Sequence, residues 1–184
     1  MTFVGVPVKG FSGAKARLAS VLDPAGRRAL GRAVADRTLR LLEAAGGVRR
    51  VVVVTGAPEV VDWARSGGRA VIAEEPGGLD GAAAAVVRAA GGHRWAVIHA
   101  DLPLLTARDL EVVLAAAERH GTVLAPSSDG GTSFVSGTGR FPFAYGVASF
   151  HRHLRAAPDA AVVVRRGLAV DLDTPDDLAA AGAF

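Results

Sequence analysis

The sequence of 184 residues contains no cysteine, no asparagine and no glutamine. Without cysteine there is no disulfide framework and no thiolate site for zinc or redox chemistry, and without asparagine there is no N-glycosylation acceptor. The chain also lacks a basic N-terminal segment followed by an apolar one, and it has no run of about 18 uninterrupted apolar residues. These absences predict a cytoplasmic protein that is neither secreted nor inserted in a membrane.

The sequence also has little excess of charge of either sign, because its formal net charge is only +3. The isoelectric point near 10.1 reflects arginines that do not deprotonate, and these arginines are scattered among acidic residues. The sequence therefore predicts neither a nucleic-acid partner nor a membrane partner. Half of the residues are hydrophobic, which at this length predicts a single domain over residues 1–184.

Short apolar runs alternate along the chain with helical patterns. The runs are Thr2 to Val8, Arg50 to Thr55, Arg69 to Glu74, Arg94 to Ala100 and Thr122 to Ser127. The helical patterns are Pro24 to Ala45, Glu59 to Arg65, Leu79 to Ala90 and Ala107 to His120. The nearly continuous hydrophobicity of the runs indicates strands covered on both faces. The order predicts an α/β fold with a mostly parallel sheet that binds ligands at the carboxyl ends of its strands.

The alternation of apolar runs and helical patterns is interrupted at residues 127–146, which are rich in glycine, serine and threonine. This composition predicts a turn, a short hairpin and a loop that form a small antiparallel insertion. A helix is then expected from Val147 to Ala156, followed by short strands at Val162 to Val164 and Leu168 to Asp173. A last helix is expected to begin at Thr174, with Pro175 in the first position.

Carboxylates stand at two predicted strand ends. Asp101 directly follows one apolar run, and Asp171 and Asp173 lie two apart on a predicted strand, so their side chains point to the same side. If the two ends converge, three carboxylates meet, which is a suitable donor set for Mg²⁺ bound together with phosphates. The alternative is that Asp101 caps a turn and Asp173 leads into the last helix.

The loop after the first run holds Lys9 and Lys15, which are the only lysines of the chain. Lysine and arginine are not equivalent at phosphate sites, because the ammonium group is a compact point charge. We therefore expect Lys9, Lys15 and Arg17 to bind a polyphosphate, with Gly10 and Gly13 allowing close approach of the backbone N–H groups. The alternative is a solvated basic loop.

Other motifs are absent or incomplete. The sequence has neither a Walker A motif nor a G-x-S-x-G motif, and the S-x-x-K match at Ser12 to Lys15 lacks its S-D-N and K-T-G partners. His151 and His153 would lie on different faces of a helix without a third ligand, so we expect surface histidines and no zinc site. His99 lies two residues before Asp101 on a predicted strand, so it could line the same face as Asp101, and the alternative is a packed core histidine.

Six segments carry a resemblance to a known family. In order, they are VPVKGFSGAKARLA, RRALGRAVADRTL, ADLPLL, GGTSF, FAYGVASFHRH and DLDTPDDL. Together they resemble the 2-phospho-L-lactate and phosphoenolpyruvate guanylyltransferases of coenzyme F420 biosynthesis over nearly the whole chain. The resemblance implies a nucleotidyltransferase-type three-layer fold, with a mixed central sheet, that condenses GTP with a three-carbon phospho-acid and releases pyrophosphate. The alanine- and arginine-rich composition resembles bacterial members, for which phosphoenolpyruvate is the expected acceptor.

The resemblance also implies roles for single residues. Asp101, Asp171 and Asp173 would face Mg²⁺, and Thr132, Gly146 and Ser149 would bind the phospho-acid. From the chemistry of the residues, we also expect Asp101 to be catalytic together with Lys9, Lys15 and Arg17. One departure is Asp80 in GGLDG, where relatives commonly have Leu-Asn. A carboxylate can accept two N–H bonds from guanine, so Asp80 is a candidate nucleotide-binding residue, and a helix N-cap is the alternative.

Two other function classes remain as alternatives. One is another nucleotidyltransferase, of the molybdopterin or sugar-phosphate type, although its usual Gly-Gly…Arg-Met-Gly loop is absent. The other is a non-catalytic nucleotide-sensing module, which would bind GTP without releasing pyrophosphate. The sequence leaves open whether the chain forms a homo-oligomer and whether it hands its product to the next transferase of the pathway. It also leaves open the choice between phosphoenolpyruvate, 2-phospho-L-lactate and 3-phosphoglycerate.

Overall fold

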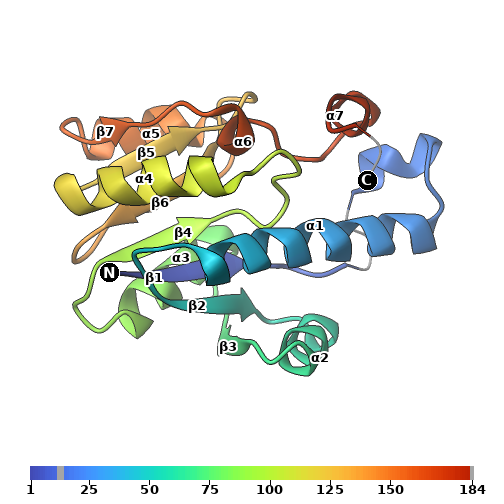
Figure 1. The fold of residues 1–184 in the computed structure, drawn as a ribbon, viewed down its shortest axis with the longest axis horizontal. Coiled ribbons are helices and arrows are strands. Elements are labelled where there is room, and N and C mark those ends of the chain that lie inside the picture. The colour runs from blue at the N-terminus through green and yellow to red at the C-terminus, as the bar shows by residue number, and fades with distance from the viewer. Residues whose placement is uncertain (12–14, 183–184) are drawn as a thin grey trace.

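The computed structural model describes residues 1–11 and 15–182. Within these ranges the chain builds one seven-stranded sheet with the strand order β3-β2-β1-β4-β6-β5-β7 (Figure 1). The strands are β1 (Thr2–Pro7), β2 (Val48–Thr55), β3 (Ala70–Ala73), β4 (Trp95–Ile98), β5 (Val123–Pro126), β6 (Thr132–Gly137) and β7 (Ala161–Val162). Strands β1 to β4 are parallel, and β6 runs antiparallel to both of its neighbours.

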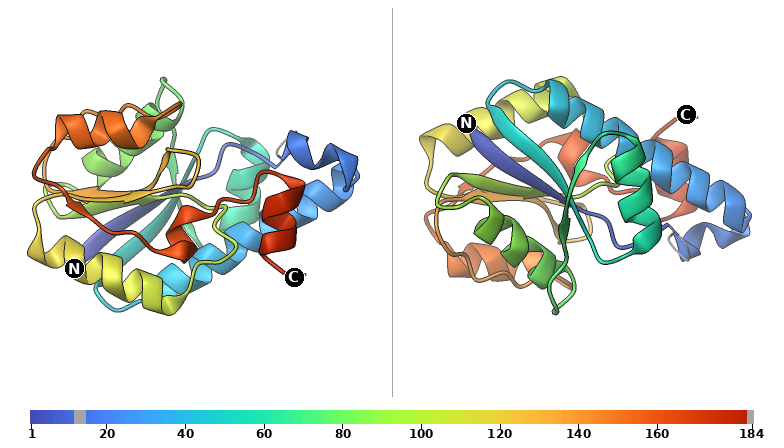
Figure 2. Two further views of the ribbon diagram at one scale, coloured as in Figure 1. Left: turned by 90° about the horizontal axis from the view of Figure 1, so that it is seen from above. Right: turned by 90° about the horizontal axis from the view of Figure 1, so that it is seen from below.

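Helices cover both faces of this sheet. They are the 3-10 helix η1 (Ala16–Ser20), α1 (Pro24–Ala44), α2 (Pro58–Ser66), α3 (Leu79–Ala89), α4 (Ala107–Arg119), α5 (Ser149–Ala156), α6 (Arg166–Ala169) and α7 (Pro175–Ala180). One core cluster joins the sheet to α1, α2, α4 and α6, and a second joins it to α3 and α5, which gives three layers (Figure 2). In the described residues, no helix is both long and apolar enough to cross a membrane. The predicted α/β class with a mostly parallel mixed sheet is confirmed.

Strand β1 shows how alternate side chains serve the two faces. Val4 and Val6 belong to the cluster on the α1 side, whereas Phe3 belongs to the cluster on the α3 side. Gly5 lies on the α3 side, and a Cβ there would overlap the side chain of Val86. The absence of a side chain at Gly5 therefore lets helix α3 pack directly against the central strand.

Polar residues mark the helix starts that the sequence predicts. The Asp23 carboxylate accepts a hydrogen bond of 2.6 Å from the Gly26 N–H at the start of α1. Helix α4 begins with a capping box between Thr106 and Asp109, and α7 begins with the same arrangement between Thr174 and Asp177. These caps bind backbone N–H groups that have no partner within the first helical turn.

Strand β6 corrects the prediction for the glycine-, serine- and threonine-rich segment. All six of its residues are buried, and it lies between β4 and β5 in the interior of the sheet. The predicted antiparallel element is therefore confirmed, but it is a central part of the sheet rather than a small insertion. Its small residues fit this place, since a Cβ on Gly137 would press against the Trp95 ring and Ser133 donates a hydrogen bond to the Ala125 carbonyl.

The strand predicted from Leu168 to Asp173 is wrong. Residues 166–169 form α6, in which Leu168 is fully buried, and an extended connection follows. That connection is held by single hydrogen bonds rather than by a strand ladder. In one of them, the Leu172 N–H donates to the Asp101 carbonyl at 2.9 Å. Strand β7 ends at Val162, so the strand predicted from Val162 to Val164 begins earlier and is shorter than expected.

Candidate functional site

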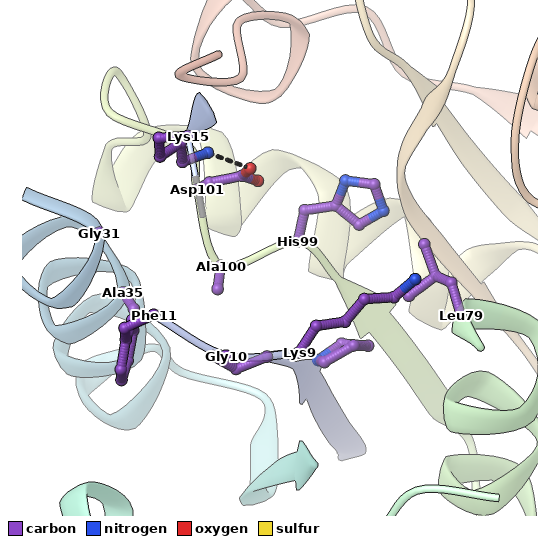
Figure 3. Close-up of a pocket in the computed structure, with 12 residues that line it drawn as sticks. Lys9, Gly10, Phe11, Lys15, Gly31, Ala35, Leu79, His99, Ala100 and Asp101 are labelled. Carbon is purple, nitrogen blue, oxygen red and sulfur yellow. Dashed lines mark hydrogen bonds and ion pairs between the residues drawn. The ribbon is translucent and has the colours of Figure 1, made fainter. Parts of the chain in front are cut away.

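A pocket opens where the direction of strand addition reverses. The chain continues from β1 to β2 on one side of β1, and β4 is added on its other side. In doubly wound sheets such a switch point leaves a crevice at the carboxyl ends of the two strands. The pocket there has a volume of about 270 Å³ and is lined by residues 7–11 after β1, residues 99–101 after β4, Lys15, Leu79 of α3, and Gly31 and Ala35 of α1 (Figure 3).

An ion pair between Lys15 and Asp101 closes one side of this pocket. The distance from Lys15 Nζ to Asp101 Oδ2 is 2.6 Å, and the lysine side chain is only 8% exposed while the aspartate side chain is 37% exposed. Burial raises the pKa of the Asp101 carboxyl, but the charge and the hydrogen bond of Lys15, together with the other polar neighbours, outweigh this effect and hold the pKa below its usual value. Asp101 is therefore kept ionised next to a nearly buried cation.

Lys9 lies on the other side of the same pocket. Its exposed side chain extends toward Leu79 at the start of α3, whereas Lys15 points to Asp101 (Figure 3). A Cβ on Gly78 would lie 3.6 Å from Lys9 Nζ, so the ammonium group is close to the N-terminus of α3. The two lysines thus bring positive charge to the pocket from two directions, and Gly10, which follows Lys9 in sequence, also lines it.

The other residues predicted in the basic loop have different positions. Arg17 forms an ion pair of 3.1 Å with Asp173, and both side chains are well exposed. Neither residue lines the pocket. Gly13 lies outside the described residues. The structure therefore brings two of the three predicted cations together and places Arg17 at the outer surface.

Asp171 is the second carboxylate beside Asp101. Burial raises its pKa, and the neighbouring charges of Asp101 and Asp129 raise it further. The hydrogen bond from the Leu172 N–H to the Asp101 carbonyl keeps the two segments side by side. Among residues 1–11 and 15–182, no three acidic, histidine or cysteine side chains are grouped closely enough to hold a metal. Carboxylate oxygens are the donors that Mg²⁺ prefers, and a metal site at Asp101 and Asp171 stays a prediction.

Sequence reasoning missed Asp129. It lies in the turn between β5 and β6, where its Oδ1 accepts hydrogen bonds from the Ser127 hydroxyl at 2.5 Å and from the Gly131 N–H at 2.8 Å. These bonds lower its pKa, while its charge acts on Asp171. An aspartate followed by two glycines is typical of a turn, so the sequence offered a structural explanation for it and no reason to place it near Asp171.

His99 takes the first of its two expected positions, on the same side as Asp101. Its ring lines the pocket between Asp101 and Lys9 instead of lying wholly in the core (Figure 3). Its Nε2 atom is buried without a hydrogen-bond partner among the described residues, and its ring packs against Tyr145 with a centroid distance of 5.8 Å. His99 therefore links the pocket to the segment before α5.

The residues expected to bind the phospho-acid gather beneath that segment. Thr132 and Ser149 are each 1% exposed, and their hydroxyl oxygens are 3.2 Å apart. Gly146 is exposed, with a φ of 106°. None of the three lines the pocket. The structure thus brings Thr132 and Ser149 together as buried hydroxyl groups and leaves Gly146 on the loop above them.

His153 corrects the expectation of two surface histidines. His151 is exposed, but His153 is fully buried and packs against the rings of Phe141, Phe143 and Tyr145. The helical pattern alone did not reveal this, because the aromatic residues that cover His153 come from the preceding loop.

Asp80 connects helix α3 to the same loop. Its Oδ1 accepts a hydrogen bond of 2.7 Å from the Tyr145 N–H. The N-cap residue of α3 is Gly78, so the alternative N-cap role of Asp80 is wrong. Recognition of guanine by Asp80 stays a prediction.

Comparisons with known proteins agree with this architecture. The family model described as "Guanylyl transferase CofC like" matches residues 2–181. The chain is 39% identical to a phosphoenolpyruvate guanylyltransferase of Rubrobacter xylanophilus, over 96% of this chain and 91% of the relative. It is 38% identical to a 3-phospho-D-glycerate guanylyltransferase of Phenylobacterium zucineum, over 92% of this chain and 84% of the relative.

Among solved structures, a nucleotidyl transferase from Methanothermobacter superposes with a TM-score of 0.65 at 18% identity, covering 96% of this chain and 94% of the other. At that identity the likeness supports the fold alone. The family model and the two relatives cover nearly the whole sequence, and the residues matched by the family model include both lysines and Asp101. The chain therefore belongs to the CofC-like family of guanylyl transferases.

Proposed function

We propose that the protein transfers GMP from GTP to the phosphate of a three-carbon phospho-acid, with phosphoenolpyruvate as the acceptor, in a cytoplasmic step of coenzyme F420 biosynthesis. One observation carries the proposal: both lysines of the chain and Asp101 meet at the switch-point pocket of a guanylyl transferase family member. The relatives are named for phosphoenolpyruvate and 3-phospho-D-glycerate, which share the three-carbon phospho-acid skeleton.

The proposed chemistry needs no general base. The second pKa of a phosphate monoester is about 6, so the acceptor phosphate is already largely a dianion at neutral pH. One of its oxygens forms a bond to the α-phosphorus of GTP, the bridging bond between the α-phosphorus and the β-phosphate oxygen breaks, and pyrophosphate leaves. The protein must align these anions and neutralise their charge. This explains why the pocket combines lysines with carboxylates rather than a catalytic dyad.

Charge neutralisation is assigned to two groups of residues. Lys9 and Lys15 approach from opposite sides, so they suit the triphosphate and the leaving pyrophosphate. Asp101 and Asp171 would hold Mg²⁺, which supplies positive charge at the phosphates when it is bound. Asp173 is already paired with Arg17 at the surface, so we assign both of these residues a supporting role.

The acceptor is assigned to the loop that contains Gly146. This loop is exposed, and the left-handed conformation of Gly146 and Ala148 turns its backbone sharply before α5. Successive backbone N–H groups in such a turn can bind an anion. Because Thr132 and Ser149 are buried beneath the loop, we assign their hydroxyl groups to its support.

The test is a turnover assay with four nucleoside triphosphates and three phospho-acids. Pyrophosphate release and the mass of the guanylylated product are the two quantities measured. We expect turnover only with GTP, and an excess of the phosphoenolpyruvate product when it competes with equal 2-phospho-L-lactate and 3-phosphoglycerate. GTP binding without pyrophosphate release would support a sensing module instead. An excess of another guanylylated product would contradict the choice of phosphoenolpyruvate as the acceptor, but it would agree with the assignment as a guanylyltransferase.

Replacing Lys15 by arginine is expected to lower the turnover number at least about 10-fold although the charge is kept. The ammonium group of Lys15 is nearly buried at 2.6 Å from Asp101, and a planar guanidinium does not fit the same space. Steady-state rates at saturating GTP check this. Arg49→Lys, at the exposed start of β2, is the matched control and should keep the wild-type rate. Wild-type turnover of Lys15→Arg would contradict the assignment.

A further inference from the structure

His153 is a buried, hydrogen-bonded histidine that does not line the pocket. It lies on α5, its side chain is 0% exposed, and the Tyr145 ring packs edge-on against it at a centroid distance of 4.9 Å. Both of its ring nitrogens have polar partners. A buried imidazole with two partners is more than core filling, because losing either bond leaves an unsatisfied polar group.

The partners of His153 determine its tautomer. The Ala144 N–H lies 2.9 Å from Nε2 and can only donate, so Nε2 must carry a lone pair. The proton of the neutral ring is then on Nδ1, which lies 2.9 Å from the Thr132 hydroxyl oxygen and donates to it. The Ser149 hydroxyl lies 3.2 Å from the same oxygen. One imidazole therefore joins the start of β6, the start of α5 and the loop between them.

This loop needs such support because of its backbone conformation. Ala148 has a φ of 54°, in the left-handed region that costs a non-glycine residue about 1 kcal/mol or more. The loop is held on one side by the Ala144 bond to His153 and by the Tyr145 N–H bond to Asp80. Arg152 holds the other side, because its guanidinium donates to the Tyr145 carbonyl at 2.9 Å.

We infer that His153, as the neutral Nδ1–H tautomer, is a positioning residue for the acceptor loop of residues 144–149. The inference rests on the proposed function, which assigns the phospho-acid to this loop. His153 does not touch the substrate; it fixes Ala144 and Thr132, and through them the backbone that would bind the acceptor anion. Its loss should therefore weaken binding of the phospho-acid and leave binding of GTP unchanged.

The surroundings of His153 keep it neutral. Burial lowers its pKa to about 4, the Asp80 carboxylate acts in the opposite direction, and the Arg152 guanidinium adds to the lowering. The pKa in the folded state is thus below the ordinary histidine value of about 6.5. Protonation favours the unfolded chain, so the stabilising effect is complete above about pH 6.5 and is lost as the pH falls from there to about 4.

The kinetic test compares three replacements. His153→Phe keeps a ring but removes both hydrogen bonds, and we expect the KM for the phospho-acid to rise at least about 10-fold while the KM for GTP changes less than about 2-fold. His153→Gln can still accept from the Ala144 N–H and should recover most of this loss. His151→Phe, on the exposed side of the same helix, is the control and should keep wild-type values.

An equal rise in both KM values, or an unchanged phospho-acid KM in folded His153→Phe, would overturn the inference. A second measurement does not depend on catalysis or on a stable variant. Two-bond ¹H–¹⁵N correlation spectra of the wild-type protein should show the Nδ1–H tautomer of His153 at neutral pH and no titration near pH 6.5. An Nε2–H tautomer or an ordinary titration would overturn the inference whether or not GTP is turned over, whereas absent turnover with the expected spectrum would count against the proposed function alone.

Discussion

Asp101→Asn is expected to lower the rate of pyrophosphate release at least about 100-fold. The replacement keeps the size of the side chain but removes the negative charge that pairs with Lys15 at 2.6 Å. It also removes one of the two carboxylates proposed to hold Mg²⁺. Because the side chain lies at the pocket rather than in the core, the melting temperature should change by less than about 5 °C. Initial rates at saturating Mg²⁺ and thermal melts measure the two effects separately.

The matched control is Asp159→Asn, which makes the same chemical change at an exposed turn after α5. It should keep the wild-type rate. We also expect Asp171→Asn to lower the rate more than Asp173→Asn, since Asp171 is coupled to Asp101 whereas Asp173 pairs with Arg17 at the surface. A near-normal rate for Asp101→Asn in a folded protein would remove this residue from the catalytic site.

Gly81→Ala is expected to destabilise the protein by about 1–3 kcal/mol, although alanine is the better helix former. A Cβ on Gly81 would overlap the backbone carbonyl oxygens of Glu75 and Pro76, where the preceding loop crosses the start of α3. Backbone atoms cannot move aside as a flexible side chain can. The melting temperature should therefore fall by about 4–8 °C for a loss of 2 kcal/mol.

Gly46→Ala is the matched control for this replacement. A Cβ on Gly46 has no atom within 4 Å, so the stability should stay the same or rise slightly. The loop that Gly81 supports leads to Gly78, which lies close to Lys9 Nζ, so turnover should fall with stability in Gly81→Ala. A melting temperature equal to that of the wild type would show that the crossing of loop and helix relaxes at little cost.

Most of the layered fold could be predicted because it depends on local patterns. The apolar runs of β1, β2 and β4 are buried on both faces, and continuous hydrophobicity is the signal for such strands. The helix starts at Ala107 and Thr174 could be predicted because the caps formed by Thr106 and Thr174 involve residues only three positions away. Signals of this kind do not require knowledge of distant neighbours.

The errors have a common physical cause, which is burial by residues outside the segment whose pattern was analysed. Strand β6 contains Thr132, Ser133 and Ser136, which by composition resemble a surface hairpin, but β4 and β5 enclose them. The sequence predicts a surface position for His153, but the aromatic side chains of the loop of residues 141–145 cover it. Propensity and periodicity describe one segment at a time, so tertiary packing overrides them at these positions.

The candidate site was predicted in part. The position of Asp101 could be predicted because it directly follows a predicted strand. Lys9 and Lys15 could be predicted because lysine occurs in one loop alone. All three residues line the same pocket. The pairing of Arg17 with Asp173 and the influence of Asp129 on Asp171 depend on how three connections meet in space. No spacing along the sequence encodes these contacts.

The central place of β6 has a consequence for synthesis on the ribosome. One edge of β4 pairs with β1, which is already made, but its other edge pairs with β6, from Trp95 opposite Gly137 to Ile98 opposite Phe134. Every residue of β4 is buried in the finished sheet. Until Gly137 has left the ribosome, the nascent chain therefore carries an apolar strand edge without its partner, and such edges promote aggregation. A chain released early, between β4 and β6, keeps this edge permanently.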